Sequence, residues 1–250
     1  MRLAALFLLL VVSPAAAEDL SVYRVNLAVD LPVTAALFGA AAIPYLVPNA
    51  ITPSCPCDPS TVNRFDRVAI GLHSSTASAL SDWTVTLAIA VPPVANALKL
   101  GFTEPLGQDV VVYAQTLALN SALVALAKYT VQRPLPVTYE GNPKYLGAQG
   151  GYRSFYSGHT SSVAAALTAS AWTLRWRYGE LVWPWIVDGA ATVSVGVERV
   201  LAGRHFPTDV ITGAVVGFGV GTWIPWLHRG GEPALSVAPA PGGFVLAARF

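Results

Sequence analysis

Six apolar segments recur along this chain, and they constrain its fold more than any other feature. Their lengths fall slightly below the ~20 residues that a helix needs to cross a ~30 Å hydrocarbon layer. Several contain many Ala, Ser, Thr and Gly residues, which let helices approach closely inside a bilayer. We predict an all-α fold, a polytopic membrane helical bundle of about six transmembrane helices; the alternative is a buried bundle in a soluble secreted protein. The segments are 31–47, 83–98, 110–127, 161–174, 181–197 and 210–227.

The composition agrees with a membrane environment. Apolar residues make up 54% of the 250 residues and charged residues only 12%, roughly half the share that is usual in soluble domains. A soluble protein with so few charges could hardly cover its surface, so we expect membrane lipids around it. The net charge of +1 gives no basic footprint for a nucleic acid, and we expect no such partner.

The N-terminus has the pattern of a secretory signal of bacterial type. Arg2 precedes the apolar run 3–12, and the small residues of 13–17 lead to Glu18. This order predicts a signal peptide at 1–17, with an uncleaved anchor as the alternative. No linker or repeat divides 18–230, which we interpret as a single domain. The Pro- and Gly-containing stretch 231–250 predicts a C-terminal tail, in which 244–250 could form a short strand.

The chain has two cysteines, Cys55 and Cys57, separated by one proline. A bridge across one residue would be strained, and two ligands are too few for a structural zinc site. We therefore expect two free thiols in a loop.

Polar residues capable of chemistry collect at the ends of the apolar segments. If every segment crosses the membrane, the end of the third and the start of the fourth lie on the same face, as do the end of the fifth and the start of the sixth. The three clusters therefore converge on one side. They are Lys128 with Arg133, Ser157-Gly158-His159, and Glu198-Arg199 with His205 and Asp209.

These residue types favour an anionic ligand. Lysine and arginine at a membrane edge are costly without an anionic partner, and a phosphate suits them because guanidinium groups bind its oxygens in a fork. Ser157-Gly158-His159 begins a predicted helix, where free amides face an anion and Gly158 allows close approach. Asp209 follows His205 by four residues, so its carboxylate could hold one imidazole nitrogen as N–H and leave the other free to attack.

The order and spacing of these motifs are familiar. Lys128 with Arg133-Pro134, Ser157-Gly158-His159, and Arg199-x5-His205-x3-Asp209 resemble the three signatures of the type-2 phosphatidic-acid phosphatase superfamily. That superfamily includes bacterial acid phosphatases and vanadium haloperoxidases. The resemblance covers residues 128 to 215, and six segments match the membrane branch. It implies a membrane phosphatase that hydrolyses a phosphomonoester or diphosphate on a lipid substrate, without a metal or cofactor.

The resemblance also implies a role for each residue. His205 is the nucleophile that forms a phosphohistidine, Asp209 orients it, and His159 protonates the leaving oxygen. Four further residues are implied to bind phosphate, with Arg133 as a fifth candidate. The four are Lys128, Ser157, Gly158 and Arg199.

The chain departs from the family pattern in three places. Tyr156 replaces a proline, and Glu198 replaces a serine, so its carboxylate could pair with Arg199. The usual register of the first motif lands on Leu135 instead of an arginine, while Arg133 comes two residues early. Either Arg133 reaches the phosphate from a shifted loop, or one clamp is missing. The nearby cations Lys144, Arg153 and Arg204 are expected to be solvated loop charges.

Two questions stay open at the level of sequence. Lys99, Arg175, Arg177 and Arg229 share one face, which the positive-inside rule makes cytoplasmic; this places the site on the periplasmic side of a bacterial inner membrane. A cleaved signal followed by six crossings would place it in the cytoplasm, so either the signal is retained or 31–47 does not cross. The alternatives for function are a vanadate-dependent haloperoxidase-like oxidoreductase and a catalytically silent protein that binds lipid phosphate.

Overall fold

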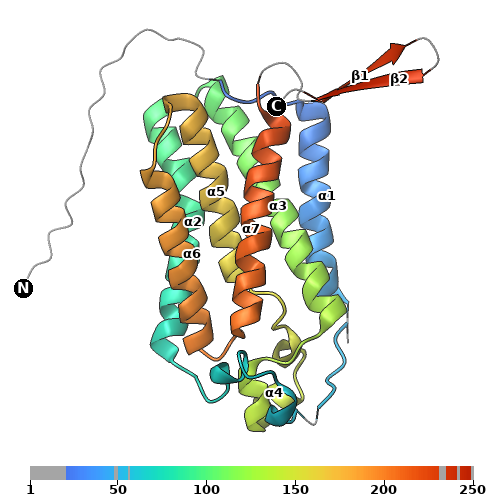
Figure 1. Cartoon of the computed structure of the whole chain (residues 1–250), viewed down its shortest axis with the longest axis vertical. Coiled ribbons are helices and arrows are strands. Elements are labelled where there is room, and N and C mark those ends of the chain that lie inside the picture. Colours follow the sequence, from blue (N-terminus) through green and yellow to red (C-terminus); the bar gives the residue numbers. More distant parts are fainter. Residues whose placement is uncertain (1–20, 48–49, 56, 231–234, 241–242, 249–250) are drawn as a thin grey trace, which may run out of the picture.

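Six long helices run side by side along one axis in the computed structural model, which describes residues 21–47, 50–55, 57–230, 235–240 and 243–248 (Figure 1). Each covers all or nearly all of one of the six apolar segments, so the predicted helical bundle is confirmed. Every helix is longer than its segment because polar residues extend and cap the ends; Ser74, for example, accepts a hydrogen bond from the Ala77 amide. The helices are α1 Leu27–Leu46, α2 Ser75–Leu100, α3 Glu104–Val131, α5 Gly158–Tyr178, α6 Trp183–Leu201 and α7 Pro207–His228.

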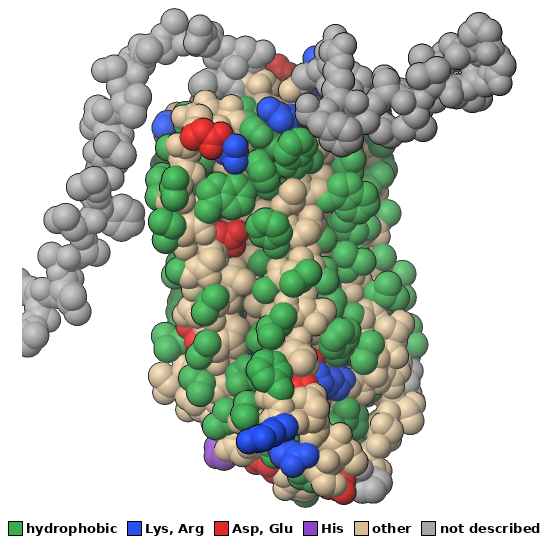
Figure 2. Space-filling model, viewed as in Figure 1, with side chains coloured by type: hydrophobic (Ala, Val, Ile, Leu, Met, Phe, Trp, Pro, Cys, Tyr) green, Lys and Arg blue, Asp and Glu red, His purple; other side chains and the backbone are tan. Residues whose placement is uncertain are grey.

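Four stretches in the described part of the chain are long and apolar enough to cross a membrane by length and composition: α1, α2, α7 and Glu104–Glu140, which includes α3. The flank of the bundle is covered by apolar side chains, and charged side chains gather mainly at its two ends (Figure 2). Helix α5 is less apolar because it packs against α2, α3, α6 and α7 and has ten buried residues. Its small and hydroxylated side chains face other helices instead of lipid.

Helices α5 and α7 pack backbone to backbone. A Cβ atom added to Gly213 would lie 2.6 Å from the Ser157 carbonyl oxygen, and Gly217 faces the Ser161 carbonyl in the same way. Any larger side chain at these positions would push the two helices apart. Because both helices begin at the same end of the bundle, this contact fixes the start of α5 against the start of α7.

The connections between α1 and α2, α3 and α5, and α6 and α7 meet at one end of the bundle, the lower end in Figure 1. They bond to one another: the Val137 amide donates to the Gly203 carbonyl at 3.3 Å, and the Ser74 amide to the Leu201 carbonyl at 3.0 Å. The predicted convergence of the three polar clusters on one side is therefore confirmed. Short elements in these connections are η1 Pro59–Thr61, η2 Arg67–Ala69, η3 Pro136–Glu140, α4 Pro143–Leu146 and η4 Gln149–Tyr152.

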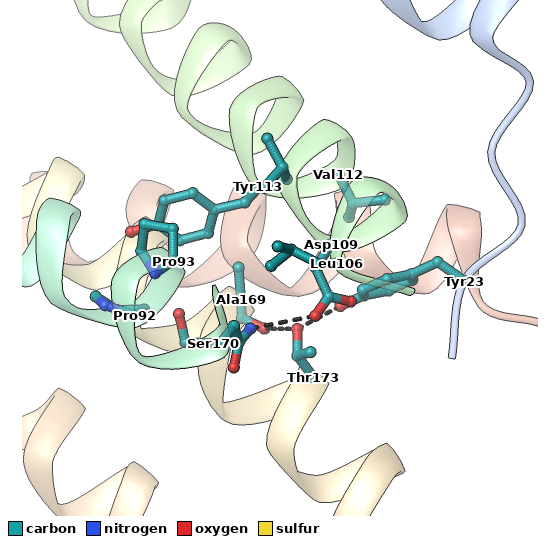
Figure 3. Close-up of a pocket in the computed structure, with 12 residues that line it drawn as sticks. Tyr23, Pro92, Pro93, Leu106, Asp109, Val112, Tyr113, Ala169, Ser170 and Thr173 are labelled. Atoms are coloured by element: carbon teal, nitrogen blue, oxygen red, sulfur yellow. Dashed lines mark hydrogen bonds between the residues drawn. The ribbon is translucent and has the colours of Figure 1, made fainter. Parts of the chain in front are cut away.

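The opposite end of the bundle is held by a buried polar cluster. Arg177 donates to both carboxylate oxygens of Asp109 at 2.7 Å, which ties α5 to α3. Tyr23 and Thr173 point toward each other, with 2.6 Å between their oxygens (Figure 3). Together with Tyr113 and others they line a cavity of about 20 Å³, room for about one water. These contacts hold α3, α5 and the segment before α1 together at this end.

Two expectations from sequence change. Cys55 and Cys57 are not free thiols, because their sulfur atoms are bonded; the loop brings their Cα atoms to 4.6 Å, within the range of disulfides. The tail contains strands β1 Leu235–Ala240 and β2 Gly243–Ala248, which pair antiparallel. The strand considered at 244–250 therefore has a partner that the sequence did not indicate. The predicted signal peptide, 1–17, lies outside the described residues.

Candidate active site

His205 lies in the connection between α6 and α7, and its imidazole is buried. The Nδ1 atom is 2.7 Å from the backbone carbonyl oxygen of Ser154. A carbonyl oxygen can only accept, so this contact assigns the hydrogen to Nδ1 and leaves the lone pair on Nε2. The nearest Asp209 oxygen is 3.9 Å from Nδ1. The Ser154 carbonyl, rather than the Asp209 carboxylate, therefore holds the imidazole directly.

Asp209 is fully buried in the first turn of α7, and both of its carboxylate oxygens accept hydrogen bonds from residues around His205. Its Oδ2 atom accepts from the Phe206 amide at 3.0 Å and from the Ser154 hydroxyl. Its Oδ1 atom accepts from Arg133 at 2.6 Å. Asp209 thus fixes the residue whose carbonyl holds His205 and the start of the helix that follows it.

The protonation state of His205 follows from its surroundings. Burial, together with the nearby cations Lys128 and Arg199, lowers the pKa of the His205 imidazole to about 3, although Asp209 acts in the opposite direction. The imidazole is therefore neutral at ordinary pH. A neutral imidazole with a free Nε2 lone pair is the form that can act as a nucleophile.

Two cationic side chains near this imidazole, Arg199 and Lys128, have N–H donors that are not used in hydrogen bonds. Arg199 is nine-tenths buried, and one of its terminal nitrogens donates to the Ser81 hydroxyl at 3.1 Å. Its Nε atom is buried and has no hydrogen-bond partner among the described residues. The Lys128 ammonium donates to the Arg153 carbonyl at 2.6 Å and can make two further bonds. A buried guanidinium N–H without a partner fits an anion that accepts from it.

The start of α5 adds backbone donors. The Ser157 hydroxyl caps the helix by accepting from the Thr160 amide at 3.3 Å. The amides of Gly158 and His159 precede the first intrahelical bond and lie at the positive end of the helix dipole. A Cβ atom at Gly158 would come within 3.2 Å of Val124 on α3. Glycine therefore allows α5 to start close to Lys128.

Arg133 is placed differently from the other cations. One terminal nitrogen bonds Asp209, and the other bonds Asp66 at 2.8 Å. Asp66, from the α1–α2 connection, is 1% exposed and also accepts from the Thr208 amide at 2.9 Å and the Thr208 hydroxyl at 2.7 Å. Burial alone would raise the pKa of the Asp66 carboxyl, but these hydrogen bonds hold it below the usual value. Leu135, at the usual arginine register, is buried.

His159 has an acidic partner that no motif indicates. Its Nε2 atom lies 2.8 Å from the Oδ1 atom of Asp82 on α2. Sequence reasoning missed Asp82 and Asp66 because both lie far from the three motifs, and a lone aspartate in a loop or helix carries no signal. Glu198, expected near Arg199, instead accepts from Thr84 at 3.3 Å and from Ser194 at 3.0 Å.

The remaining nearby cations contact aromatic rings. The Arg153 guanidinium lies 5.2 Å from the Tyr45 ring centroid and 5.3 Å from that of Tyr129, and its buried Nε lacks a partner among the described residues. Arg153 is therefore not the solvated charge that we expected. Lys144 and Arg204 both lie near the Tyr145 ring. In the described part of the chain, no group of three or more His, Cys, Asp or Glu side chains is placed to hold a metal ion.

The fold and this geometry define a class: a membrane helix bundle that brings two histidines and partly unpartnered cations together at one end. Comparison with protein families agrees, because the PAP2 superfamily matches residues 109–231. This region contains all eight site residues that the sequence analysis names. Over this region the chain belongs to the PAP2 superfamily.

Comparisons with individual proteins give more distant matches. The chain is 29% identical to a lipid A 1-phosphatase of Porphyromonas gingivalis over 144 residues, which are 55% of this chain and 29% of that protein. Aquifex aeolicus LpxE matches 63% of this chain and 90% of its own, with 23% identity and a TM-score of 0.44. The first transmembrane PAP2 type phosphatidylglycerolphosphate phosphatase from Bacillus subtilis matches 78% and 93%, with 20% identity and a TM-score of 0.46.

Proposed function

We propose that this protein is a membrane phosphatase that removes phosphate from a lipid through a phosphohistidine intermediate. The observation that carries the proposal is the buried, neutral His205 imidazole with Nε2 free, flanked by Lys128 and by Arg199 with its unpartnered Nε. This arrangement combines a nucleophile with donors for the charge that a phosphoryl group carries in the transition state. Membership of the PAP2 superfamily supports it.

The reaction has two steps. Lys128, Arg199, the Ser157 hydroxyl and the Gly158 amide hold the non-bridging phosphate oxygens, which stay on phosphorus throughout. The His205 Nε2 atom attacks phosphorus, the bond from phosphorus to the lipid oxygen breaks, and protonated His159 gives its proton to that oxygen. Water then attacks phosphorus, its proton passes to His159, the phosphorus–nitrogen bond breaks, and inorganic phosphate leaves. The sequence of steps needs no metal ion, since these cations and amides supply the electrostatic stabilisation.

Arg133 has a positioning role in this proposal. Both of its terminal nitrogens are bonded to carboxylates, so it supports Asp209, which in turn fixes Ser154 and the imidazole. The clamp that the usual register would provide is therefore absent at Leu135. Arg153 is the nearest replacement, because its Nε is unpartnered and its carbonyl accepts from Lys128.

The location of the site supports a lipid substrate. Both histidines lie at the end of the bundle where α5 and α7 begin, and the flank carries exposed apolar side chains (Figure 2), which suits a substrate with a phosphate headgroup at the membrane surface and lipid chains beside the helices. The relative from Porphyromonas gingivalis carries the name lipid A 1-phosphatase. We propose that the substrate of this chain is likewise a phosphomonoester or diphosphate on a membrane lipid.

We place the site on the periplasmic face of a bacterial inner membrane. The disulfide between Cys55 and Cys57 lies in a connection at the site end, and disulfides persist in oxidising compartments such as the periplasm. Lys99, Arg175 and Arg229 lie at the other end, but Arg64, Lys144 and Arg204 lie at the site end, so the disulfide and not the positive-inside rule carries this placement. The Arg24 amide bonds the His228 carbonyl at the end of α7, whereas the site lies at the start of α7, so in this orientation Arg24 is cytoplasmic. This orientation is incompatible with cleavage of a translocated signal at 1–17.

Phosphate release from the purified protein, measured with a panel of lipid phosphates, tests the function. His205→Ala should lower the rate by at least about a thousandfold, whereas His73→Ala, an exposed histidine at the same end, should leave it unchanged. Rapid quenching with labelled substrate should give acid-labile, alkali-stable phosphoprotein in the wild type and none in His205→Ala. Retention of more than about a tenth of the activity in His205→Ala would refute the nucleophile. Bromide oxidation by the vanadate-loaded protein, or lipid binding without phosphate release, would support the alternatives.

A further inference from the structure

Helix α2 contributes an acidic side chain to the active site from outside the region that matches the family. Asp82 lies in the third turn of this helix, near the site end. Its Oδ1 atom is 2.8 Å from His159 Nε2. The same oxygen is 3.9 Å from a terminal nitrogen of Arg199, to which the neighbouring Ser81 hydroxyl is bonded at 3.1 Å. Two adjacent residues of α2, Ser81 and Asp82, therefore contact Arg199 and His159 of the proposed site.

The chemistry of the contact limits what it can do. An ionised carboxylate only accepts, so His159 donates its Nε2 hydrogen to Asp82. The Nδ1 atom is then the one left to exchange a proton with the substrate. A carboxylate on one nitrogen of a histidine stabilises the imidazolium and fixes the ring, as the aspartate of a Ser-His-Asp triad does. Asp82 is 64% exposed at its side chain, so this stabilisation competes with water.

We propose that Asp82 is a positioning residue that holds His159 in its proton-donating form, so that the Nδ1 hydrogen of His159 passes to the leaving oxygen of the lipid. The inference rests on the proposed function, because it assigns a partner to the general acid of that reaction. The proton balance is unchanged: Nδ1 loses its hydrogen as the phosphorus–oxygen bond breaks, and regains one from water in the second step. The Nε2 hydrogen stays on the bond to Asp82 throughout.

The dependence on the leaving group separates this role from a merely structural one. An alkoxide such as that of a lipid alcohol is a poor leaving group and needs the proton, whereas p-nitrophenolate leaves without it. Asp82→Asn should therefore lower kcat/KM for an alkyl phosphate about 10- to 100-fold, and that for p-nitrophenyl phosphate less than about threefold. The ratio kcat/KM reports the phosphorylation step, so the second step, common to both substrates, does not mask the difference.

Two further variants complete the experiment. Asp82→Glu, which keeps the carboxylate, should recover part of the alkyl phosphate activity. Glu198→Gln removes a carboxylate that bonds Thr84 of the same helix but not His159, and it should change neither substrate's kcat/KM.

Three results would overturn the inference while leaving the phosphatase function intact. Equal loss on both substrates would make Asp82 a structural residue, and no loss on either would make the contact irrelevant. A lower KM with unchanged kcat would show that Asp82 competes with phosphate for Arg199. If the wild type releases phosphate from neither substrate nor from any lipid phosphate, the function itself fails, and His205→Ala would then look like the wild type.

Discussion

Replacing Arg133 with alanine distinguishes a phosphate clamp from a support for buried carboxylates. Asp66 and Asp209 are 1% and 0% exposed and share this guanidinium at 2.8 and 2.6 Å. Removing one partner of a buried ion pair typically costs 3–5 kcal/mol, because the other charge stays buried. The Arg133 side chain is 22% exposed, so water screens part of that cost. We expect a loss of about 2–3 kcal/mol, a midpoint lower by roughly 5–10 °C for a chain of this size.

The measurement is thermal unfolding of the purified protein in detergent, paired with phosphate release. Arg133→Ala should lower both the midpoint and kcat, since Asp209 can no longer fix Ser154 and the start of α7. Arg64→Ala, an exposed arginine in the α1–α2 connection two residues before Asp66, is the matched control and should change neither. Combining Arg133→Ala with Asp66→Asn should be less harmful than the two single effects added, because the pair is coupled. If Arg133→Ala unfolds like the wild type but binds phosphate or vanadate more weakly, the support role is refuted, and Arg133 is a phosphate-binding residue instead.

Two further predictions follow from the site end. The pKa of His205 is lowered from an ordinary 6.5 to about 3, so below pH 6.5 the imidazole is protonated in the unfolded chain but stays neutral in the folded chain. The contribution of the neutral, buried imidazole to the free energy of unfolding is complete above pH 6.5. It is lost as the pH falls below that value, by up to about 1.4 kcal/mol per pH unit. The unfolding midpoint should therefore fall between about pH 6.5 and 4.5 and fall less in His205→Gln, and an equal fall in both proteins would contradict the assignment. For orientation, a cysteine at Asn142, in a Cys55→Ser, Cys57→Ser background, should react with a membrane-impermeant maleimide in intact cells, and one at Glu180 should not; the reverse pattern would place the site in the cytoplasm.

The helices and the meeting of the motifs could be predicted because both depend on local patterns. Apolar segments of about membrane length give helices whatever they pack against, and counting crossings places the three motifs together. Helix α5 was the weakest signal. Its Thr160, Ser161 and Thr168 lower its hydropathy, and they are tolerated because neighbouring helices, not lipid, surround them.

The contacts that complete the site could not be predicted, because they join residues far apart in the chain. Asp66 and Arg133 are separated by 67 residues, and Asp82 and His159 by 77. Neither aspartate has a distinctive neighbour. The role of Asp209 also shifts, because the i to i+4 spacing suggested a direct bond to His205, whereas the loop brings the Ser154 carbonyl into that place. Spacing along a helix says nothing of a backbone carbonyl that arrives from another segment.

The charge balance at the site bears on which phosphate it receives. Arg133 is shared between Asp66 and Asp209, so it adds little attraction for a ligand. Lys128 rests on a carbonyl, and Arg199 lies 3.9 Å from Asp82, so these two cations keep most of their charge for a ligand. A phosphomonoester carries close to two negative charges near neutral pH, whereas a diester carries one. Two available cations therefore match a terminal phosphate, and a diester would leave one of them buried without a partner, which costs free energy. Within the proposed function, this charge balance favours release of a terminal phosphate over cleavage within a phosphodiester headgroup.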